Sequence, residues 1–201
     1  MDHVTSYLEE TAAIARELDG RRIDELAIAL VALRERGGRL FVLGTGGGAG
    51  HASHAVCDFR KLCGIEAYTP ADNVSELTAR TNDEGWDAAY VDWLRASRLR
   101  ASDMLLVFSV GGGDADRNIS RNLVRAMELG RELGCVIAGV VGRDGGFTAK
   151  VADICILVPT VNSERITVHT EAFQAVVWHL LVCDPRVATS GMKWETTTRA
   201  K

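Results

Sequence analysis

Two reactive side chains stand four residues apart, directly after the most glycine-rich stretch of the sequence. His54 and Asp58 follow the run GTGGGAG, which begins at Gly44. On a helix, residues four apart share one face with Cβ atoms ~6 Å apart, so this pair can grip a divalent metal or pass a proton. His51 precedes His54 by one turn and lies near the same stripe. An ordinary surface ion pair accounts for this spacing about equally well.

A second pair of reactive side chains lies near the C-terminus, in the apolar stretch HTEAFQAVVWHLL. Glu171 and His179 are eight residues apart there, which on a helix separates them by ~12 Å along the axis. A zinc ligand lies ~2 Å from its metal, so one helix cannot easily deliver both side chains to one ion. Either a neighbouring subunit supplies one of them or substrate lies between them. A histidine satisfied within the core is the alternative for His179.

Two glycine clusters, GTGGG and GGG, each follow an apolar run that is typical of a buried strand. Backbone N–H groups of a glycine loop that leads into a helix can point at an anion, and the helix N-terminus adds roughly half a positive charge. A tight turn for close packing is the alternative for either cluster alone. The first loop lacks the Lys-Ser/Thr of a P-loop and matches the dinucleotide fingerprint only weakly, so an NAD-dependent enzyme receives little weight.

Strands must alternate with helices to position these groups. Strands are predicted at residues 39–44, 65–69, 103–110, 135–142 and 154–159. Helices are predicted at residues 4–18, 23–36, 49–62, 73–80, 86–98 and 164–182, with another that ends at Leu133 and is capped by Asn118 or Ser120. TNDEGW (81–86) and RDGG (143–146) are predicted turns. The alternation predicts an α/β fold, with a five-stranded parallel sheet flanked by helices on both faces and an N-terminal helical extension. Both glycine loops then lie at carboxyl ends of strands, where open α/β sheets bind ligands.

Composition excludes several classes of partner. The 201 residues are 47% hydrophobic and 25% charged, with a net charge of −4, so the chain offers no broad basic field for nucleic acid or an anionic membrane. No apolar run approaches the ~20 residues that span a bilayer. The five cysteines are scattered and form no C-x-x-C pair, which favours reduced thiols in the core and a cytoplasmic location.

In order and spacing, several motifs together resemble the sugar isomerase (SIS) superfamily, and within it the phosphoheptose isomerases. These motifs are GTGGGAGHASH with Asp58, TNDEGW, FSVGGG, GRDGG, and the last helix with Glu171 and His179. That family converts sedoheptulose 7-phosphate to D-glycero-D-manno-heptose 7-phosphate through an enediol, as a homotetramer with zinc in sites between subunits. The resemblance implies oligomerising helices at 1–37, a single SIS domain at 38–185 and a polar tail at 186–201.

Site roles also follow from the resemblance, position by position. It implies that Asp58 and His179 are catalytic. It implies one Zn²⁺ per subunit, bound by His54, Asp58, Glu171 and His179. It implies that the substrate is lined by Thr45, Gly46, Gly47, Gly48, Asn82, Asp83, Ser109, Val110, Gly111, Asp114, Asn118, Ser120 and Glu171. A turn that uses Asn and Asp for local backbone bonds is the alternative for Asn82 and Asp83.

The sequence departs from the family pattern at its catalytic and phosphate-binding positions. Asp58 stands where the family usually has Glu, and Glu171 where it has Gln. Polar side chains of the two loops are replaced by Thr45, Gly48, Val110, Gly111 and Asp114. A longer ketose phosphate, such as an octulose 8-phosphate, is therefore an alternative substrate. A non-catalytic SIS module that senses a sugar phosphate is a second alternative, although both His/carboxylate pairs favour an enzyme.

Overall fold

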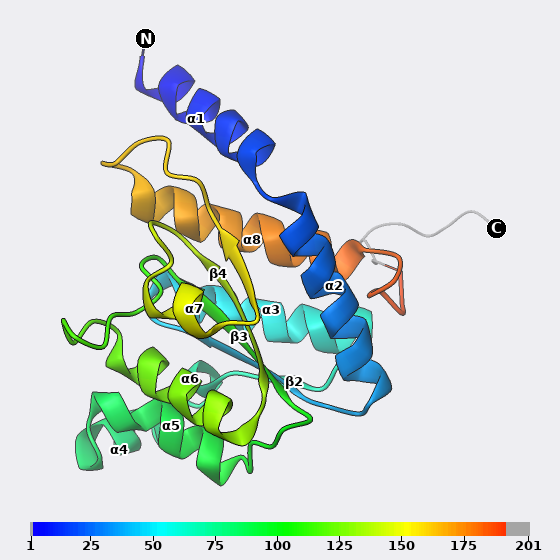
Figure 1. Ribbon diagram of the computed structural model, residues 1–201, viewed down its shortest axis with the longest axis vertical. Coiled ribbons are helices and arrows are strands. Elements are labelled where there is room, and N and C mark those ends of the chain that lie inside the picture. The colour runs from blue at the N-terminus through cyan, green and yellow to red at the C-terminus, as the bar shows by residue number, and fades with distance from the viewer. Residues whose placement is uncertain (1, 192–201) are drawn as a thin grey trace.

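The computed structural model describes residues 2–191, which form one parallel sheet between two layers of helices (Figure 1). Its strands lie in the order β2-β1-β3-β4-β5. They are β1 (Leu40–Gly44), β2 (Ala67–Tyr68), β3 (Met104–Ser109), β4 (Val136–Val141) and β5 (Ile154–Leu157). The register pairs Gly44 of β1 with Phe108 of β3, so the two glycine-rich loops leave the sheet side by side. The predicted five-stranded parallel sheet is confirmed.

The helices divide between the two faces because successive strand residues point to opposite sides. They are α1 (His3–Glu17), α2 (Gly20–Glu35), α3 (Gly47–Cys63), α4 (Val74–Asp83), α5 (Trp86–Ala96), α6 (Arg121–Leu133), α7 (Gly146–Val151) and α8 (Ile166–Cys183), with a 3₁₀ turn at Pro70–Asp72. Leu40 and Val42 belong to the core cluster shared with α2, α3 and α8. Phe41 and Leu43 belong to the cluster shared with α5 and α6. The face that carries α3 and α8 also carries the reactive side chains.

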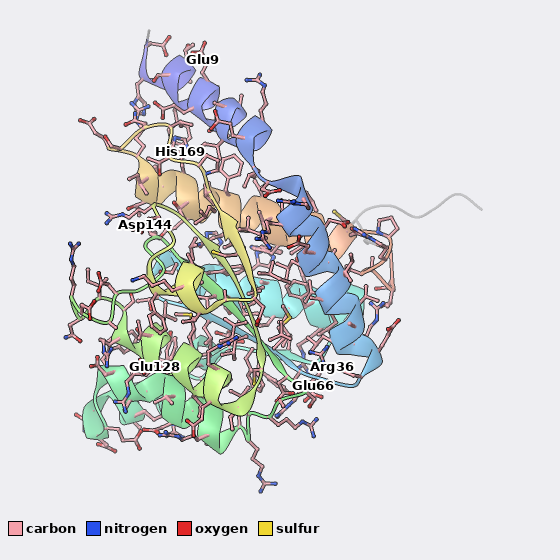
Figure 2. All side chains as sticks on the ribbon, viewed as in Figure 1. Glu9, Arg36, Glu66, Glu128, Asp144 and His169 are labelled. Atoms are coloured by element: carbon pink, nitrogen blue, oxygen red, sulfur yellow. The ribbon has the colours of Figure 1, made fainter. Side chains whose placement is uncertain are left out.

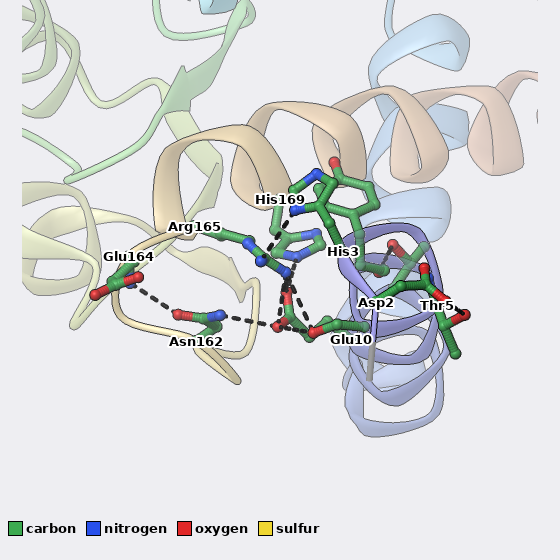
Figure 3. A network of polar contacts seen from close by, with 11 residues as sticks. Asp2, His3, Thr5, Glu10, Asn162, Glu164, Arg165 and His169 are labelled. Carbon is green, nitrogen blue, oxygen red and sulfur yellow. Dashed lines mark hydrogen bonds and ion pairs between the residues drawn. The ribbon is translucent and has the colours of Figure 1, made fainter.

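Helix α1 extends away from the sheet (Figure 1) and is held to the start of α8 by a polar network (Figure 3). The Glu10 carboxylate accepts hydrogen bonds from Asn162 at 2.8 Å and from the Arg165 guanidinium at 3.1 Å. It also lies 2.9 Å from His169 Nε2, and the Tyr7 ring stacks on the His169 imidazole with centroids 4.5 Å apart. The network therefore fixes the first turn of α8, two residues before Glu171.

This network makes a pH-dependent contribution to stability. The hydrogen bonds from Asn162, His169 and Arg165 hold the pKa of Glu10 at about 2, against 4.5 ordinarily. A carboxyl group whose pKa is lower in the folded state stabilises the fold above its unfolded pKa, and this contribution is lost as the pH falls. We expect Glu10→Gln to lower the melting temperature at pH 6. The difference in melting temperature between this variant and the unsubstituted protein should shrink as the pH falls from 4.5 to 2.

The matched control is Glu9→Gln, one residue earlier on the exposed face of α1 (Figure 2). Thermal melts of both variants across this pH range check the expectation. A Glu10→Gln difference that is constant with pH would contradict it.

Two segments differ from the sequence-based expectation. The predicted turn TNDEGW is helical through Asp83, because Arg80 pairs with Glu76 at 2.8 Å and Glu84 at 3.3 Å along the last turns of α4. The short helix α7 was not predicted. Tertiary bonds form it: the N–H groups of Phe147 and Thr148 donate to carbonyls of the second glycine loop.

The start of the predicted polar tail is anchored to α2 and α3. Val187 is fully buried, and the Arg34 guanidinium donates to the carbonyl oxygens of Arg186 and Val187. The N–H groups of Thr189 and Ser190 donate to Leu62 at the end of α3. The rest of that predicted segment, 192–201, lies outside the described residues.

By length and composition alone, helix α8 could cross a membrane. No apolar run of such a length was predicted from the sequence. Core helices pass the same test, and α8 buries Phe173, Val177 and Trp178 against the sheet.

The cysteines also differ from expectation: Cys63 and Cys135 are buried, with pKa values raised by burial to about 11, whereas Cys57 and Cys183 are exposed.

Candidate functional site

Three of the predicted side chains meet between α3 and α8. His54, Asp58 and His179 each offer a ligand atom, and these atoms lie within 4.8 Å of one another. Asp58 Oδ2 is 3.8 Å from His54 Nε2 and 4.0 Å from His179 Nε2. Asp58 thus lies between two imidazoles, one from its own helix and one from the neighbouring helix. The predicted shared face of His54 and Asp58 is confirmed.

The packing of α3 on α8 positions this group. Trp178 is buried, and its ring centroid lies 4.7 Å from that of His54 and 3.4 Å from that of His179. The His54 imidazole meets the indole edge-on and the His179 imidazole is tilted against it, while 60% of the His54 side chain and 50% of the His179 side chain face solvent. Asp58 is more enclosed, with 18% of its side chain exposed. The group is open enough to receive a substrate.

Glu171 stands apart from this group, over the first residue of α3. A Cβ atom on Gly47 would lie within 2.6 Å of three carboxyl atoms of Glu171, so the carboxylate occupies the space beside this glycine. His51 is half-buried nearby: burial lowers its pKa, and the negative charge of Glu171 opposes that shift. The helix N-terminus, which favours an anion, thus has a carboxylate of this chain beside it. Whether Glu171 ligates a metal stays a prediction.

The first glycine loop is held by two side chains that sequence reasoning missed. The Tyr90 hydroxyl donates to the Gly44 carbonyl at 2.6 Å, and burial raises the Tyr90 pKa to about 12. Asn122, fully buried at the start of α6, donates to the Thr45 hydroxyl at 3.2 Å. The sequence indicated a role for Asn122 only weakly, as a polar residue that follows a glycine-rich loop. It gave no indication of the role of Tyr90, which lies in an apolar helix pattern.

The second glycine loop bonds both to itself and to the segment that begins α7. Ser109 Oγ accepts from the Gly112 N–H at 3.0 Å. Asp114 and Ile119 exchange both backbone hydrogen bonds, so residues 114–119 form a closed hairpin. The Asp114 carboxylate accepts from the N–H groups of Arg117 and Asp116, which lower its pKa. Asp114 therefore has a structural role in this loop.

The remaining predicted residues of this region lie around the hairpin. Asn118 is exposed at its tip. Ser120 precedes α6 as predicted, but it has a left-handed φ of 50° and its hydroxyl makes no capping bond. Val110 and Gly111 link β3 to the loop and are half-buried. None of these four has a contact that assigns it to substrate, so their roles stay predictions.

Asn82 and Asp83 lie on the last turn of α4, exposed to solvent, and bond to each other at 2.7 Å. Within residues 2–191, no hydrogen bond or ion pair joins either side chain to the His54, Asp58 and His179 group. Their predicted contact with sugar hydroxyls is not tested by this geometry.

Comparisons with known proteins repeatedly find phosphoheptose isomerases. Phosphoheptose isomerase of Geobacter metallireducens is 32% identical over 171 residues, which cover 83% of this chain and 86% of that protein. Lincomycin biosynthesis protein LmbN of Streptomyces lincolnensis is 32% identical over 155 residues, 72% of this chain and 54% of that protein. The structure of phosphoheptose isomerase GmhA from Neisseria gonorrhoeae matches with a TM-score of 0.77 at 24% identity, over 89% of this chain and 95% of that one. No family model matches the sequence.

Proposed function

Because this chain belongs to the phosphoheptose isomerase family and is an isomerase, we propose that it converts sedoheptulose 7-phosphate to D-glycero-D-manno-heptose 7-phosphate through an enediol. The observation that carries the proposal is the meeting of Asp58 with His54 and His179 at an open face between two helices. An aldose–ketose exchange needs a base for the carbon proton and an acid for the oxygens, and this group contains both kinds of side chain.

The donor set suits a divalent metal, which we propose is one Zn²⁺ per subunit. Two imidazoles and one carboxylate, with ligand atoms within 4.8 Å of one another, match the three protein ligands of catalytic zinc sites. His54, Asp58 and His179 would hold the ion, and the partner subunit's Glu171 is the proposed fourth ligand, because Glu171 of the same chain lies ~12 Å along α8 from His179. When bound, zinc supplies Lewis-acid polarisation of the substrate carbonyl.

The side chains of the chain itself account for the proton transfers. Asp58 removes the proton from C1 of the ketose and returns it to C2, and the enclosed position of this carboxylate limits exchange with water. His179 donates a proton to the carbonyl oxygen at C2 and accepts the proton of the C1 hydroxyl as the new carbonyl forms. Glu171 lies ~12 Å along α8 from His179, in the direction of the two glycine loops, where it is placed to accept hydrogen bonds from sugar hydroxyls.

The proposed substrate contacts extend from this group to the loops. The first loop contributes Thr45, Gly46, Gly47 and Gly48, and the second contributes Ser109, Val110, Gly111, Asp114, Asn118 and Ser120. Asn82 and Asp83 are proposed to contact the sugar from the end of α4. The N–H groups of both loops are the proposed donors to the phosphate.

We propose that the protein works in the cytoplasm as a homotetramer with helices 1–37 in its interfaces. Exposed apolar side chains on α1 and α8 support this assembly, notably Leu8 at 61%, Val168 at 48% and Val176 at 47% exposure. Because His54 and His179 are half or more exposed beside this surface of α8, a neighbouring subunit would enclose the reacting end of the substrate.

An eight-carbon ketose phosphate is the alternative substrate, and the similarity to an antibiotic biosynthesis protein favours retaining it. A sugar-phosphate sensor without turnover is the alternative from another class.

Assays of sedoheptulose 7-phosphate and an octulose 8-phosphate, each with zinc and after chelation, separate these functions. Zinc-dependent turnover of the seven-carbon sugar supports the proposal, and preference for the eight-carbon sugar supports the alternative substrate. Tight binding without metal or turnover would leave only the sensor.

A further inference from the structure

The indole of Trp178 belongs to a cluster of three rings between α3 and α8, which pack side by side (Figure 1). Its ring centroid is 4.7 Å from that of His54 and 3.4 Å from that of His179. The two imidazoles also meet each other edge-on, with centroids 5.6 Å apart. Trp178 therefore contacts both imidazoles of the proposed zinc site, although an indole offers no atom that binds a metal.

No hydrogen bond within residues 2–191 orients these two imidazoles. Asp58 Oδ2 comes only to 3.8 Å from His54 Nε2 and 4.0 Å from His179 Nε2, which is beyond hydrogen-bond distance. A histidine that binds a metal usually donates its other ring N–H to a carboxylate, a carbonyl oxygen or water, and this bond fixes the orientation of the ring. Since no side chain or carbonyl of the described residues has that role here, packing has to orient both rings.

The contact between Trp178 and His179 does not follow from their being neighbours in the chain. Adjacent side chains on a helix point about 100° apart and do not face each other. Trp178 points into the core and is 1% exposed, whereas half of the His179 side chain faces solvent. The His179 imidazole nevertheless lies against the indole at 38°, and His54 reaches the same indole from α3 at 63°. One core side chain thus limits the rotation of both rings.

Tryptophan is a costly choice for this position in the core. The Nε1–H group of Trp178 is buried and has no acceptor among residues 2–191. A buried indole N–H usually has a hydrogen-bond partner, and leaving it unpaired reduces stability. Phenylalanine or leucine would fill an apolar cluster such as this one without that loss. The unpaired N–H group therefore indicates that the large ring is present for its contacts with the imidazoles.

We propose that Trp178 is a positioning residue of the zinc site. Its indole holds the His54 and His179 imidazoles in the orientation that binds the ion, in place of the hydrogen bonds that usually do so. The inference rests on the proposed isomerase function and its metal. A smaller side chain at position 178 leaves space beside both rings, so they turn more freely and have to be ordered again when the ion binds.

The test compares the zinc affinity of Trp178→Leu, Trp178→Phe and the unsubstituted protein, measured by competition with a chromophoric chelator. Trp178→Leu should weaken zinc binding about tenfold to a hundredfold, the usual effect of losing a group that orients a metal ligand. Trp178→Phe should weaken it less, because a phenyl ring still supports part of each imidazole. Loss of the indole N–H cannot itself account for weaker binding, since this group bonds to nothing among residues 2–191.

The matched control is Trp93→Leu. Trp93 is partly buried on α5, where its ring meets that of Phe41 edge-on at 5.7 Å in the core cluster on the opposite face of the sheet. The variant makes the same change from indole to leucine without altering the surroundings of His54 and His179, so its zinc affinity should equal that of the unsubstituted protein. Circular dichroism melts of all variants, recorded without zinc, show whether each is folded.

A merely structural role for Trp178 predicts a different result. A folded Trp178→Leu variant that binds zinc as tightly as the unsubstituted protein overturns the proposal, and so does an equal loss of affinity in Trp93→Leu. Where Trp178→Leu is unfolded, Trp178→Phe decides: weaker zinc binding supports the proposal and unchanged binding overturns it.

The measurement also separates this inference from the function on which it rests. Zinc binding is measured without substrate, so weaker binding in Trp178→Leu supports the positioning role even if sedoheptulose 7-phosphate is not turned over. If the unsubstituted protein binds no zinc, NMR relaxation of the His54 and His179 ring carbons decides. Both rings should be ordered in the unsubstituted protein and in Trp93→Leu but mobile in Trp178→Leu, and equal mobility in all three overturns the proposal.

Discussion

Asp58→Asn lowers kcat by about 10²–10⁴, the usual contribution of a positioned acid or base, while the protein stays folded. The amide has the shape of the carboxylate but cannot accept the carbon proton. His179→Gln should reduce kcat by a similar factor, because the imidazole 4.0 Å from Asp58 Oδ2 serves the oxygens. Both measurements use sedoheptulose 7-phosphate at saturating concentration, with zinc content determined for each variant.

The matched control for this pair is Asp92→Asn. Asp92 is a partly buried carboxylate on α5 that pairs with Arg95 at 2.8 Å, on the opposite face of the sheet. Asp92→Asn makes the same carboxylate-to-amide change at a position that does not contact the group between α3 and α8. Near-normal turnover in both Asp58→Asn and His179→Gln would reject the assignment, and an equal loss in Asp92→Asn would show that the effect is not specific to the site.

Gly112→Ala is expected to be among the most destabilising single changes in the chain, at roughly 2–4 kcal/mol. Gly112 has a φ of 70°, and an added Cβ atom would overlap the carbonyl group of Gly145. The Gly112 carbonyl also accepts hydrogen bonds from both the N–H and the hydroxyl of buried Thr148. Backbone atoms on both sides would have to move, which separates the second loop from α7.

Gly111→Ala is the control for stability. Its Cβ atom would lie 3.9 Å from Arg143 Cδ, an ordinary contact, and its φ is not positive. Urea unfolding of the two variants should give a large decrease in midpoint for Gly112→Ala and a small one for Gly111→Ala. Equal midpoints would contradict the packing described for this loop.

The sheet could be predicted from sequence because its central strands are short apolar runs, and a glycine cluster begins within two residues after β1 and after β3. The pairing of His54 with Asp58 could be predicted as well, since helical spacing alone sets it. The meeting of this pair with His179 depends on the packing of α8 against α3. The sequence suggested a common site from its two His/carboxylate pairs, but helical spacing does not set a contact between two helices.

What escaped prediction depends on partners distant in the chain. Helix α7 has six residues, too few for a periodic pattern, and its N–H groups bond to the second loop. The anchoring of residues 186–190 requires Arg34, some 150 positions earlier. The Tyr90 hydrogen bond to Gly44 likewise joins two elements whose contact no local pattern records.

The bodies of two core helices carry the reacting group, whereas the proposed phosphate contacts lie in the two glycine loops at the end of the sheet, the second of which includes the hairpin 114–119. Insertions or substitutions in residues 110–120 can therefore alter which sugar is accepted while the proton-transfer apparatus stays in place. An engineer who wants a new ketose as substrate should diversify that hairpin first and leave α3 and α8 unchanged. The same separation gives evolution an independent route to new substrates within one reaction type.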